Sequence, residues 1–323
     1  MDASQGVLLS SALVGAGANG APAWPELLGS AHWDGLIDPL DLTLRRLVLL
    51  CGDLCQVTYD SFNSDAHSNA RDQLLAAVRE LVAKYKGESL SIVCTGHSLG
   101  ASLATLCASA MVASGVSKGG DAHFPVTAIV FGSPQVGNPE FKKRFDELPG
   151  LRALHVRNKP DLIPLYPSNL LGYANVGDEL SVNSKKSPHV RPDTTNVGDY
   201  HNLQGILHTV AGWNGEKGEF KLQVNRSVAL VNKSSAFLKD DNLVPESWWV
   251  ERNKGMVLGP TGEWELEQPA EENLPVPPVV TGKVIDDDVA DTISSKEPKI
   301  PEDQGKKKTK GTKFLPACFR GVN

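Results

Sequence analysis

The sequence lacks a surplus of basic residues. Of its 323 residues, 32 are Lys or Arg and 38 are Asp or Glu, so the formal net charge is −6. A chain whose main partner is nucleic acid needs a basic surplus to neutralise phosphates, and this composition excludes that class. The sequence also has no run of eighteen apolar residues, so we expect no transmembrane segment.

Cysteine is scarce as well. The five cysteines are too few and too scattered for a disulfide scaffold, and an odd number fits a reducing compartment. Cys51 and Cys55 lie one helical turn apart, but no second pair of ligands is near them, so we expect buried core thiols rather than a metal site. No motif in the sequence calls for a metal or another cofactor.

Residues 7–23 are rich in Gly and Ala and lack the positive n-region of a secretory signal. The composition of residues 1–23 predicts a disordered leader. We expect a cytoplasmic protein, with the chloroplast as the alternative location.

The hydrophobic pattern alternates between strand and helix. Helical spacing follows Asp41 over residues 42–59 and recurs over about 69–85 and 101–113, while Asn138-Pro139-Glu140 is typical of a helix start. Short apolar runs at 90–95, 126–131 and 153–156 predict buried parallel strands. This alternation predicts an α/β fold around a parallel sheet.

Gly96-His97-Ser98-Leu99-Gly100 carries the strongest chemical signal. A Gly-x-Ser-x-Gly match alone is weak, and Gly115-Val116-Ser117-Lys118-Gly119 matches it too. Only Ser98 follows a predicted strand and opens a predicted helix, which is the strand–turn–helix elbow that presents a nucleophilic serine. We therefore predict Ser98 as a nucleophile and Ser117 as a loop residue.

A nucleophilic serine needs a base and a group that orients the base, and in α/β-hydrolases they follow in the order acid, then histidine. Asp161 follows the 153–156 strand, between two prolines that hold the loop out of helix, and is the predicted acid. No clear strand precedes the weaker candidates, which are Asp178, Asp193 and Asp199. Spacing favours His201 as the base because it lies where a loop enters a helix, and it leaves His208 and His189 as alternatives.

Longer motifs surround these residues. They are WPELLGSAHWDGLIDPLD, YDSFNSD, GHSLGASLATL, FGSPQVGN, LHVRNKPDLIPLYP, HNLQGILHTVAGW and LVPESWWVERNKGM. Together they resemble the plant class II phospholipase A1 group of the class 3 lipases, over nearly all of residues 24–268. The resemblance implies an α/β-hydrolase fold over 24–268, removal of acyl chains from glycerolipids, and a triad at Ser98, Asp161 and His201. Residues 269–323 are predicted to be a disordered, charged tail.

The chain departs from this family before the elbow. The resemblance implies a loop with an oxyanion donor, several strands and a lid between YDSFNSD and the 69–85 helix, yet only a few residues separate them here. About a hundred or more residues are missing, as after an internal deletion. The backbone N–H of Leu99 would supply one oxyanion donor, and loss of the other typically costs ~10²–10³ in rate.

These observations predict a serine lipid acyl hydrolase that works through an acyl-enzyme. Its substrate is expected to be a phospholipid or another glycerolipid at a membrane surface. The alternative is a catalytically silent, truncated isoform that binds lipid or a full-length relative. Trp248-Trp249 is predicted to pack the C-terminal segment onto the sheet, with a lipid contact as the alternative.

Overall fold

The computed structural model describes residues 21–61, 70–119, 122–249 and 251–267. A short helix, α2 (Trp24–Leu27), precedes the long helix α3 (Leu42–Ser61). The carboxylate Oδ1 of Asp41 accepts hydrogen bonds from the N–H groups of Thr43 (2.7 Å) and Leu44 (3.0 Å), so Asp41 caps α3. This confirms the predicted helix start.

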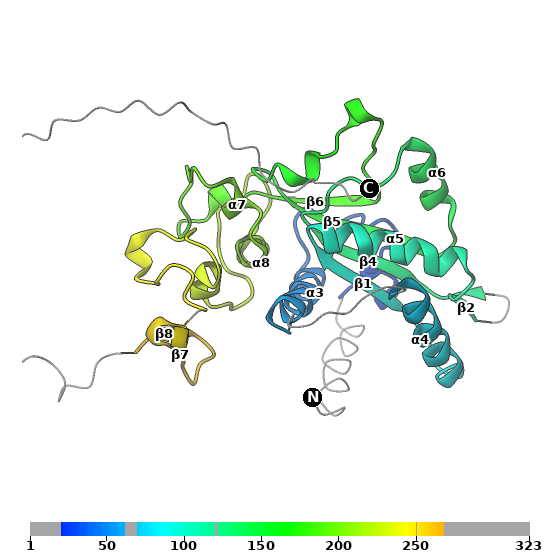
Figure 1. Cartoon of the computed structure of the whole chain (residues 1–323), viewed down its shortest axis with the longest axis horizontal. Coiled ribbons are helices and arrows are strands. Elements are labelled where there is room, and N and C mark those ends of the chain that lie inside the picture. Colours follow the sequence, from blue (N-terminus) through cyan, green and yellow to red (C-terminus); the bar gives the residue numbers. More distant parts are fainter. Residues whose placement is uncertain (1–20, 62–69, 120–121, 250, 268–323) are drawn as a thin grey trace, which may run out of the picture. The chain divides into compact units, whose positions relative to one another are not determined.

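A four-stranded parallel sheet forms the centre of the described structure, in the order β1-β4-β5-β6 (Figure 1). Its strands are β1 (Ile92–His97), β4 (Val126–Phe131), β5 (Leu151–Asn158) and β6 (Asp178–Val182), and each neighbouring pair is parallel. The predicted α/β fold with a parallel sheet is confirmed. Two short antiparallel hairpins join β2 (Lys118–Gly119) to β3 (Ala122–His123) and β7 (Met256–Leu258) to β8 (Trp264–Leu266).

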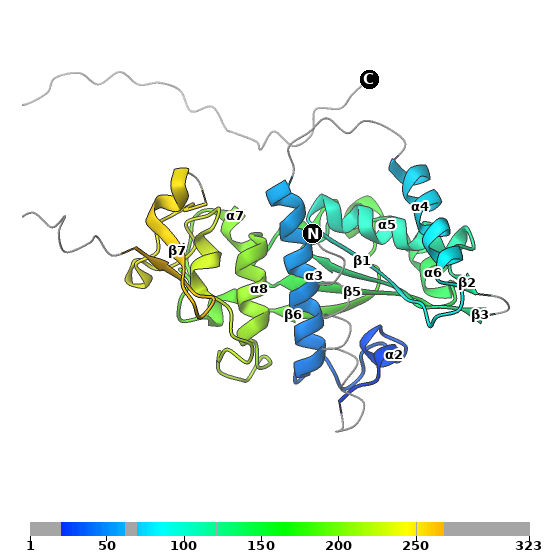
Figure 2. The ribbon, with the colours of Figure 1, turned by 90° about the horizontal axis from the view of Figure 1, so that it is seen from below.

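Helices cover both faces of the sheet. The small residues Ala101, Ala104 and Ala108 of α5 (Leu99–Ala113) pack on β4 and β5, together with α6 (Pro139–Glu147). On the other face, α3 and α8 (Leu203–Gly212) lie side by side (Figure 2), and their apolar residues pack on Ile129 and Phe131 of β4. Because alternate residues of β4 face the two layers, the whole strand is buried, as its mostly apolar sequence predicted.

The first strand is not buried in the predicted way. β1 pairs only with β4 among the strands of the described residues, so it lies at an edge of the sheet, and five of its six residues are partly exposed. An apolar strand is expected to have partners on both sides. Among the described residues, no strand therefore pairs with the outer backbone N–H and C=O groups of β1.

The helix α4 (Ala70–Lys84) differs from its prediction in the same region. The helical spacing predicts a packed face made of Leu74, Val78, Leu81, Val82 and Tyr85, yet Leu74 and Leu81 are 42% and 53% exposed. Among the described side chains of α4, only Leu75 is buried, in a small cluster that includes Met111 and Val116. The narrow contact explains why much of the apolar face remains in solvent.

The C-terminal part of the described chain consists mostly of short turns of helix. They are α7 (Val197–Tyr200) and the 3₁₀ helices Ile163–Leu165, Asn169–Leu171, Ser184–Lys186, Val228–Asn232, Asp240–Asn242 and Glu251–Gly255. Trp248 is fully buried and donates from Nε1 to the carbonyl of Ala229 (2.7 Å). Trp248 packs with Ala229 and Met256 inside the C-terminal segment and not onto the four-stranded sheet as predicted, while Trp249 is 44% exposed.

The boundaries 24–268 of the hydrolase domain stay a prediction. The predicted leader, except for its last three residues, and the predicted tail 269–323 lie outside the described residues. Cys51 and Cys55 are both 3% exposed and belong to the main core, as expected. Within the described ranges, no helix is long and apolar enough to cross a membrane.

Candidate active site

Ser98 lies in a sharp turn between β1 and α5. Its backbone angles are φ 58° and ψ −128°, a conformation that a residue with a side chain adopts only under strain. Gly96 makes the turn possible, because a Cβ at this position would lie 2.2 Å from the carbonyl oxygen of Gly100. The N–H of Ser98 donates to the carbonyl of Phe131 (3.0 Å), which holds the turn against the end of β4.

Asp161 and His201 form a short hydrogen bond. The distance from Nδ1 of His201 to Oδ2 of Asp161 is 2.6 Å, and Asp161 is only 1% exposed. The other carboxylate oxygen, Oδ1, accepts from the N–H of Ile163 (2.9 Å). Both oxygens of the carboxylate are therefore fixed. Because Nδ1–H donates to Oδ2, Nε2 is the ring nitrogen of His201 that can accept a proton.

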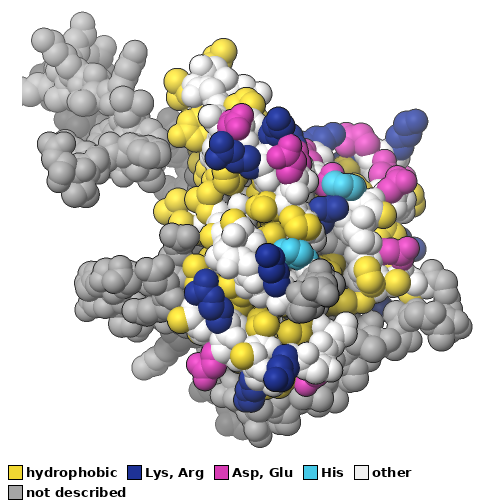
Figure 3. Space-filling view, turned by 90° about the vertical axis from the view of Figure 1, so that its right-hand side faces the viewer, with side chains coloured by type: hydrophobic (Ala, Val, Ile, Leu, Met, Phe, Trp, Pro, Cys, Tyr) yellow, Lys and Arg dark blue, Asp and Glu magenta, His cyan; other side chains and the backbone are white. Residues whose placement is uncertain are grey.

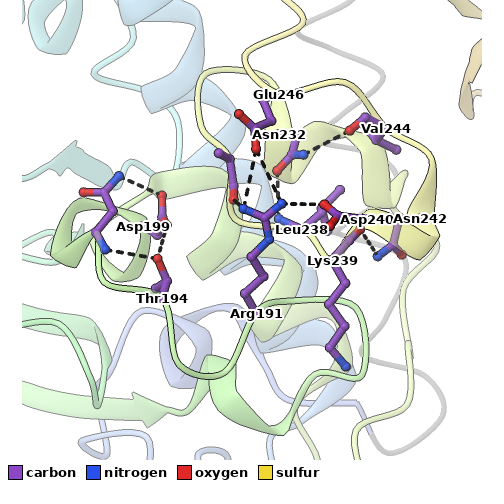
Figure 4. Close-up of polar contacts among 12 residues, drawn as sticks. Arg191, Thr194, Asp199, Asn232, Leu238, Lys239, Asp240, Asn242, Val244 and Glu246 are labelled. Carbon is purple, nitrogen blue, oxygen red and sulfur yellow. Dashed lines mark hydrogen bonds and ion pairs between the residues drawn. The ribbon is translucent and has the colours of Figure 1, made fainter. Parts of the chain in front are cut away.

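The loop that presents His201 is held by side chains on both sides. Nδ2 of Asn158, at the end of β5, donates to the carbonyl of Tyr200 (2.9 Å). Asp199 accepts from Thr194 (2.6 Å; Figure 4) and from Asn196 (3.1 Å), and Asn196 also caps α7. These bonds fix the backbone on which His201 follows α7.

A second group of polar contacts ties this loop to the segment after α8. Arg191 donates to Asp240 (2.6 Å) and to Glu246 (3.4 Å), and Asn232 accepts from the N–H of Leu238 (2.8 Å; Figure 4). The segment that leads to His201 is thus held by hydrogen bonds to residues about forty positions after His201 in the chain.

The rings of His201 and His97 are in contact. Their centroids are 4.6 Å apart, and Nε2–H of His97 donates to the carbonyl oxygen of His201 (2.8 Å). Burial, together with the charge of His201, lowers the pKa of His97 to about 3, so His97 is neutral near pH 7. His97 was not among the predicted site residues, because the variable position of a Gly-x-Ser-x-Gly motif carries no chemical signal.

Gly132 closes the site from the end of β4. A Cβ at Gly132 would lie 2.9 Å from Cε1 of His201 and 3.1 Å from Oδ2 of Asp161. Its φ of +55° also favours glycine. His201 and Asp161 therefore pack directly against the backbone of Gly132, where a side chain would not fit.

Within the described part of the chain, no hydrogen bond joins Ser98 to His201. Nε2 of His201 is buried and has no hydrogen-bond partner among the described residues. Ser98 is nevertheless the residue next to His97, whose ring contacts His201. Leu99 is the first residue of α5 and is 68% exposed, and the first N–H groups of a helix lack an acceptor within the helix.

The other candidates have different partners. His208 is fully buried against Ser187 (2.8 Å), with its pKa lowered to about 3 by burial, and His189 contacts Asn242 (3.0 Å). The remaining acids, Asp178, Asp193 and Asp199, pair with His32 (3.0 Å), Lys185 (3.8 Å), and Thr194 and Asn196, respectively. Of the three candidate histidines, His201 is the one that bonds to Asp161.

Ser117 is fully buried in the loop after α5, and its Oγ lies 3.0 Å from Nδ1 of His123. No elbow surrounds it, so the second Gly-x-Ser-x-Gly match is a structural serine. In the described ranges, no group of three or more His, Cys, Asp or Glu side chains is arranged to hold a metal ion.

Known proteins have sequences similar to this one. The model of the family "Lipase (class 3)" matches residues 37–171. Phospholipase A1-II 5 of Oryza sativa subsp. indica is 54% identical over an alignment that covers 98% of this chain and 96% of the rice protein. Phospholipase A1-IIdelta of Arabidopsis thaliana is 55% identical over 64% of this chain and 48% of its own length. A lipase structure from Rhizopus microsporus var. chinensis is 22% identical over 42% of this chain and 39% of its own, with a TM-score of 0.29.

The rice alignment also measures a difference in length. It has 455 positions, while this chain has 323 residues, so at least 132 positions have no counterpart here. A difference of this size was predicted from the motifs. Because the rice protein is 54% identical and is matched over nearly its whole length, the chain belongs to the class 3 lipase family, in the plant class II phospholipase A1 group.

Proposed function

We propose that this protein is a serine lipid acyl hydrolase of the phospholipase A1 type, with Ser98, Asp161 and His201 as its catalytic residues. The observation that carries the proposal is the 2.6 Å bond between Asp161 and His201, formed beside a serine in a strained elbow. The relatives named above are phospholipases A1, which supports the same class of reaction.

The reaction divides into two steps. Oγ of Ser98 attacks the ester carbonyl while Nε2 of His201 takes its proton, and Asp161 stabilises the imidazolium that forms. The tetrahedral intermediate collapses when His201 returns the proton to the departing alcohol, which leaves an acyl group on Ser98. Water, deprotonated by His201, then attacks this acyl-enzyme and releases a fatty acid.

The negative oxygen of the intermediate needs hydrogen-bond donors. The N–H of Leu99, at the start of α5, supplies one of them. A second donor is expected from the residues that the rice protein has and this chain lacks, so we propose a slower enzyme than the full-length relatives, by ~10²–10³. The lack of a described bond between Ser98 and His201 fits a site that tightens only when substrate is bound.

Labelling with a fluorophosphonate tests this proposal, since only an activated serine reacts. We expect labelling of the purified chain and none in Ser98→Ala. Ser117→Ala is the matched control, because Ser117 lies in the second Gly-x-Ser-x-Gly match but is buried, and this variant should label like the parent. A folded parent that does not label at all would refute the proposed activity.

The substrate is proposed to be a phospholipid or another glycerolipid at a membrane surface. Hydrolysis of a short-chain soluble ester and of phospholipid vesicles, measured side by side, separates general esterase activity from lipase activity. The location, in the cytoplasm or alternatively the chloroplast, stays a prediction from composition.

A further inference from the structure

A loop beside the candidate site exposes an unusual amount of apolar surface. It follows Asp161 and spans residues 162–173; we call it the leucine loop. Leu170 is 98% exposed and Leu171 is 70% exposed, and Tyr166 is 60% exposed. Single exposed apolar residues are common in soluble proteins, but a cluster of them marks a surface that meets an apolar partner.

The loop also lacks charge. The sixteen residues from 162 to 177 contain no Asp, Glu, Lys or Arg, in a chain where 22% of residues are charged. Figure 3 shows hydrophobic side chains gathered along the upper margin of this face, with charged side chains below them. A surface without charge enters the apolar part of a bilayer without the cost of burying an ion.

The loop is pre-formed by hydrogen bonds to the segment after β4. The N–H of Gln135 donates to the carbonyl of Tyr166 (2.7 Å), and Nε2 of Gln135 donates to Asn169 and to Asn175 (3.0 Å each). Gly172 then ends the short helix Asn169–Leu171 with a φ of +82°. The tip that carries Leu170 and Leu171 is therefore presented in a defined conformation, so little ordering is needed on binding.

The position of the loop relates it to catalysis. The leucine loop follows β5, its anchor Gln135 follows β4, and Ser98 follows β1. The carboxyl ends of parallel strands meet at one edge of a sheet, so the loop and Ser98 share that edge. Figure 1 shows the segment between β5 and β6 standing clear of the sheet.

We propose that the leucine loop is a membrane-docking surface: Leu170 and Leu171 insert between the acyl chains of a lipid bilayer, which places the carboxyl edge of the sheet against the substrate. The partner is the apolar interior of the bilayer, so docking does not require anionic headgroups and changes little with salt. This inference rests on the proposed function for its purpose, but binding itself requires no catalysis.

The test is flotation with phosphatidylcholine vesicles, performed in the Ser98→Ala background so that no lipid is hydrolysed. We expect the parent to float with the vesicles equally at 0.1 M and 1 M salt. The double variant Leu170→Ser/Leu171→Ser should partition about 100-fold less, since burial of one leucine side chain corresponds to roughly tenfold or more. Because both side chains are in solvent, the variant should melt at the parent temperature.

Leu243→Ser is the matched control. Leu243 is 77% exposed, but the charged residues Asp240 and Asp241 lie just before it in the chain. It is therefore an exposed leucine in a charged environment, and its variant should float like the parent. Failure of the parent to bind neutral vesicles, or equal binding by the double variant, would overturn the proposal. Binding that appears only with anionic vesicles and vanishes in high salt would also overturn it, because the attraction would then be electrostatic.

A second readout separates this proposal from the proposed activity. With Ser98 restored, the double variant should hydrolyse a soluble short-chain ester at the parent rate and lose activity only on vesicles. An equal loss of activity on the soluble ester and on vesicles would show that the leucine loop supports the structure of the active site and does not act by docking the protein on the membrane. If neither protein hydrolyses any ester while flotation behaves as expected, the enzyme assignment fails and the docking surface stands.

Discussion

Replacement of Asp161 by Asn tests the candidate triad most sharply, because the structure dictates how the amide must sit. Oδ1 of Asp161 accepts from the N–H of Ile163, and an amide can keep this bond only with its oxygen in the same place. The NH₂ group of the introduced amide then takes the position of Oδ2, 2.6 Å from Nδ1 of His201. Nδ1 must become the acceptor, so the proton moves to Nε2.

A histidine that carries its proton on Nε2 is unable to accept one from Ser98. The comparable substitution in a serine protease triad lowers kcat by ~10⁴ with the geometry intact, which corresponds to roughly 5.5 kcal/mol of transition-state stabilisation. We expect a loss of this order for Asp161→Asn. Because the amide is isosteric with the carboxylate and keeps the bond to Ile163, stability should change little.

The assay is kcat on a soluble ester, with fluorophosphonate labelling as a second measure. Asp178→Asn is the control, since Asp178 also bonds a histidine, His32, at 3.0 Å, but on the surface and away from Asp161. It should leave kcat unchanged. A loss below tenfold in Asp161→Asn, from a folded variant, would show that Asp161 does not set the tautomer of the catalytic base.

Three further predictions concern the contacts around His201 and the buried histidines. Gly132→Ala should lower kcat by ~10² or more, because its Cβ would lie 2.9 Å from Cε1 of His201 and must displace the ring; unchanged kcat would mean that the backbone yields instead. His97→Phe keeps a ring but removes the donor to the carbonyl of His201, so we expect about a tenfold loss in kcat, as for one hydrogen bond, with KM unchanged on a soluble ester. Burial lowers the pKa of His155 to about 4 and of His208 to about 3, so between these values and the ordinary 6.5 the unfolded state binds more protons than the folded state. The free energy of unfolding should therefore fall as pH falls below about 6.5, by up to ~1.4 kcal/mol per pH unit for each histidine; urea unfolding at pH 7, 6 and 5 measures it, and a flat profile would contradict the burial of these rings.

The exposed edge of β1 has a practical consequence for these measurements. Within the described ranges β1 has no strand on its outer side, and an open strand edge of this kind favours association with other chains. Every variant therefore needs its oligomeric state measured alongside its activity, so that a loss of rate through association is distinguished from a loss through chemistry.

Much of the site could be inferred from the chain alone. The order Ser98, Asp161, His201 and the position of each after a predicted strand or before a helix identified the pair that the structure joins at 2.6 Å. Local signals were sufficient there because strand ends, helix caps and tight turns depend on a few neighbouring residues. The caps at Asp41 and Asn138 were found for the same reason.

What depends on distant parts of the chain was not visible in the sequence. The strand β6, at Asp178–Val182, was missed because its residues do not form an apolar run, and β1 was expected to be buried although it lies at an edge. His97 and Gly132 meet His201 only after folding, from turns 104 and 69 residues earlier in the chain. The exposure of Leu170 likewise depends on the tertiary structure, because it is set by how little of the described chain packs against this side chain.

The elbow, the helix starts, the alternation of strands and helices, and the short list of candidate residues could be predicted from the chain, since each follows from local conformational preference and hydrophobic period. The fold was needed to learn which acid meets which histidine, which strand lies at the edge, and which leucines stay in solvent. Burial and hydrogen bonding at a site are set by residues far apart in the chain, and their mutual distances arise when the sheet and its helices have packed.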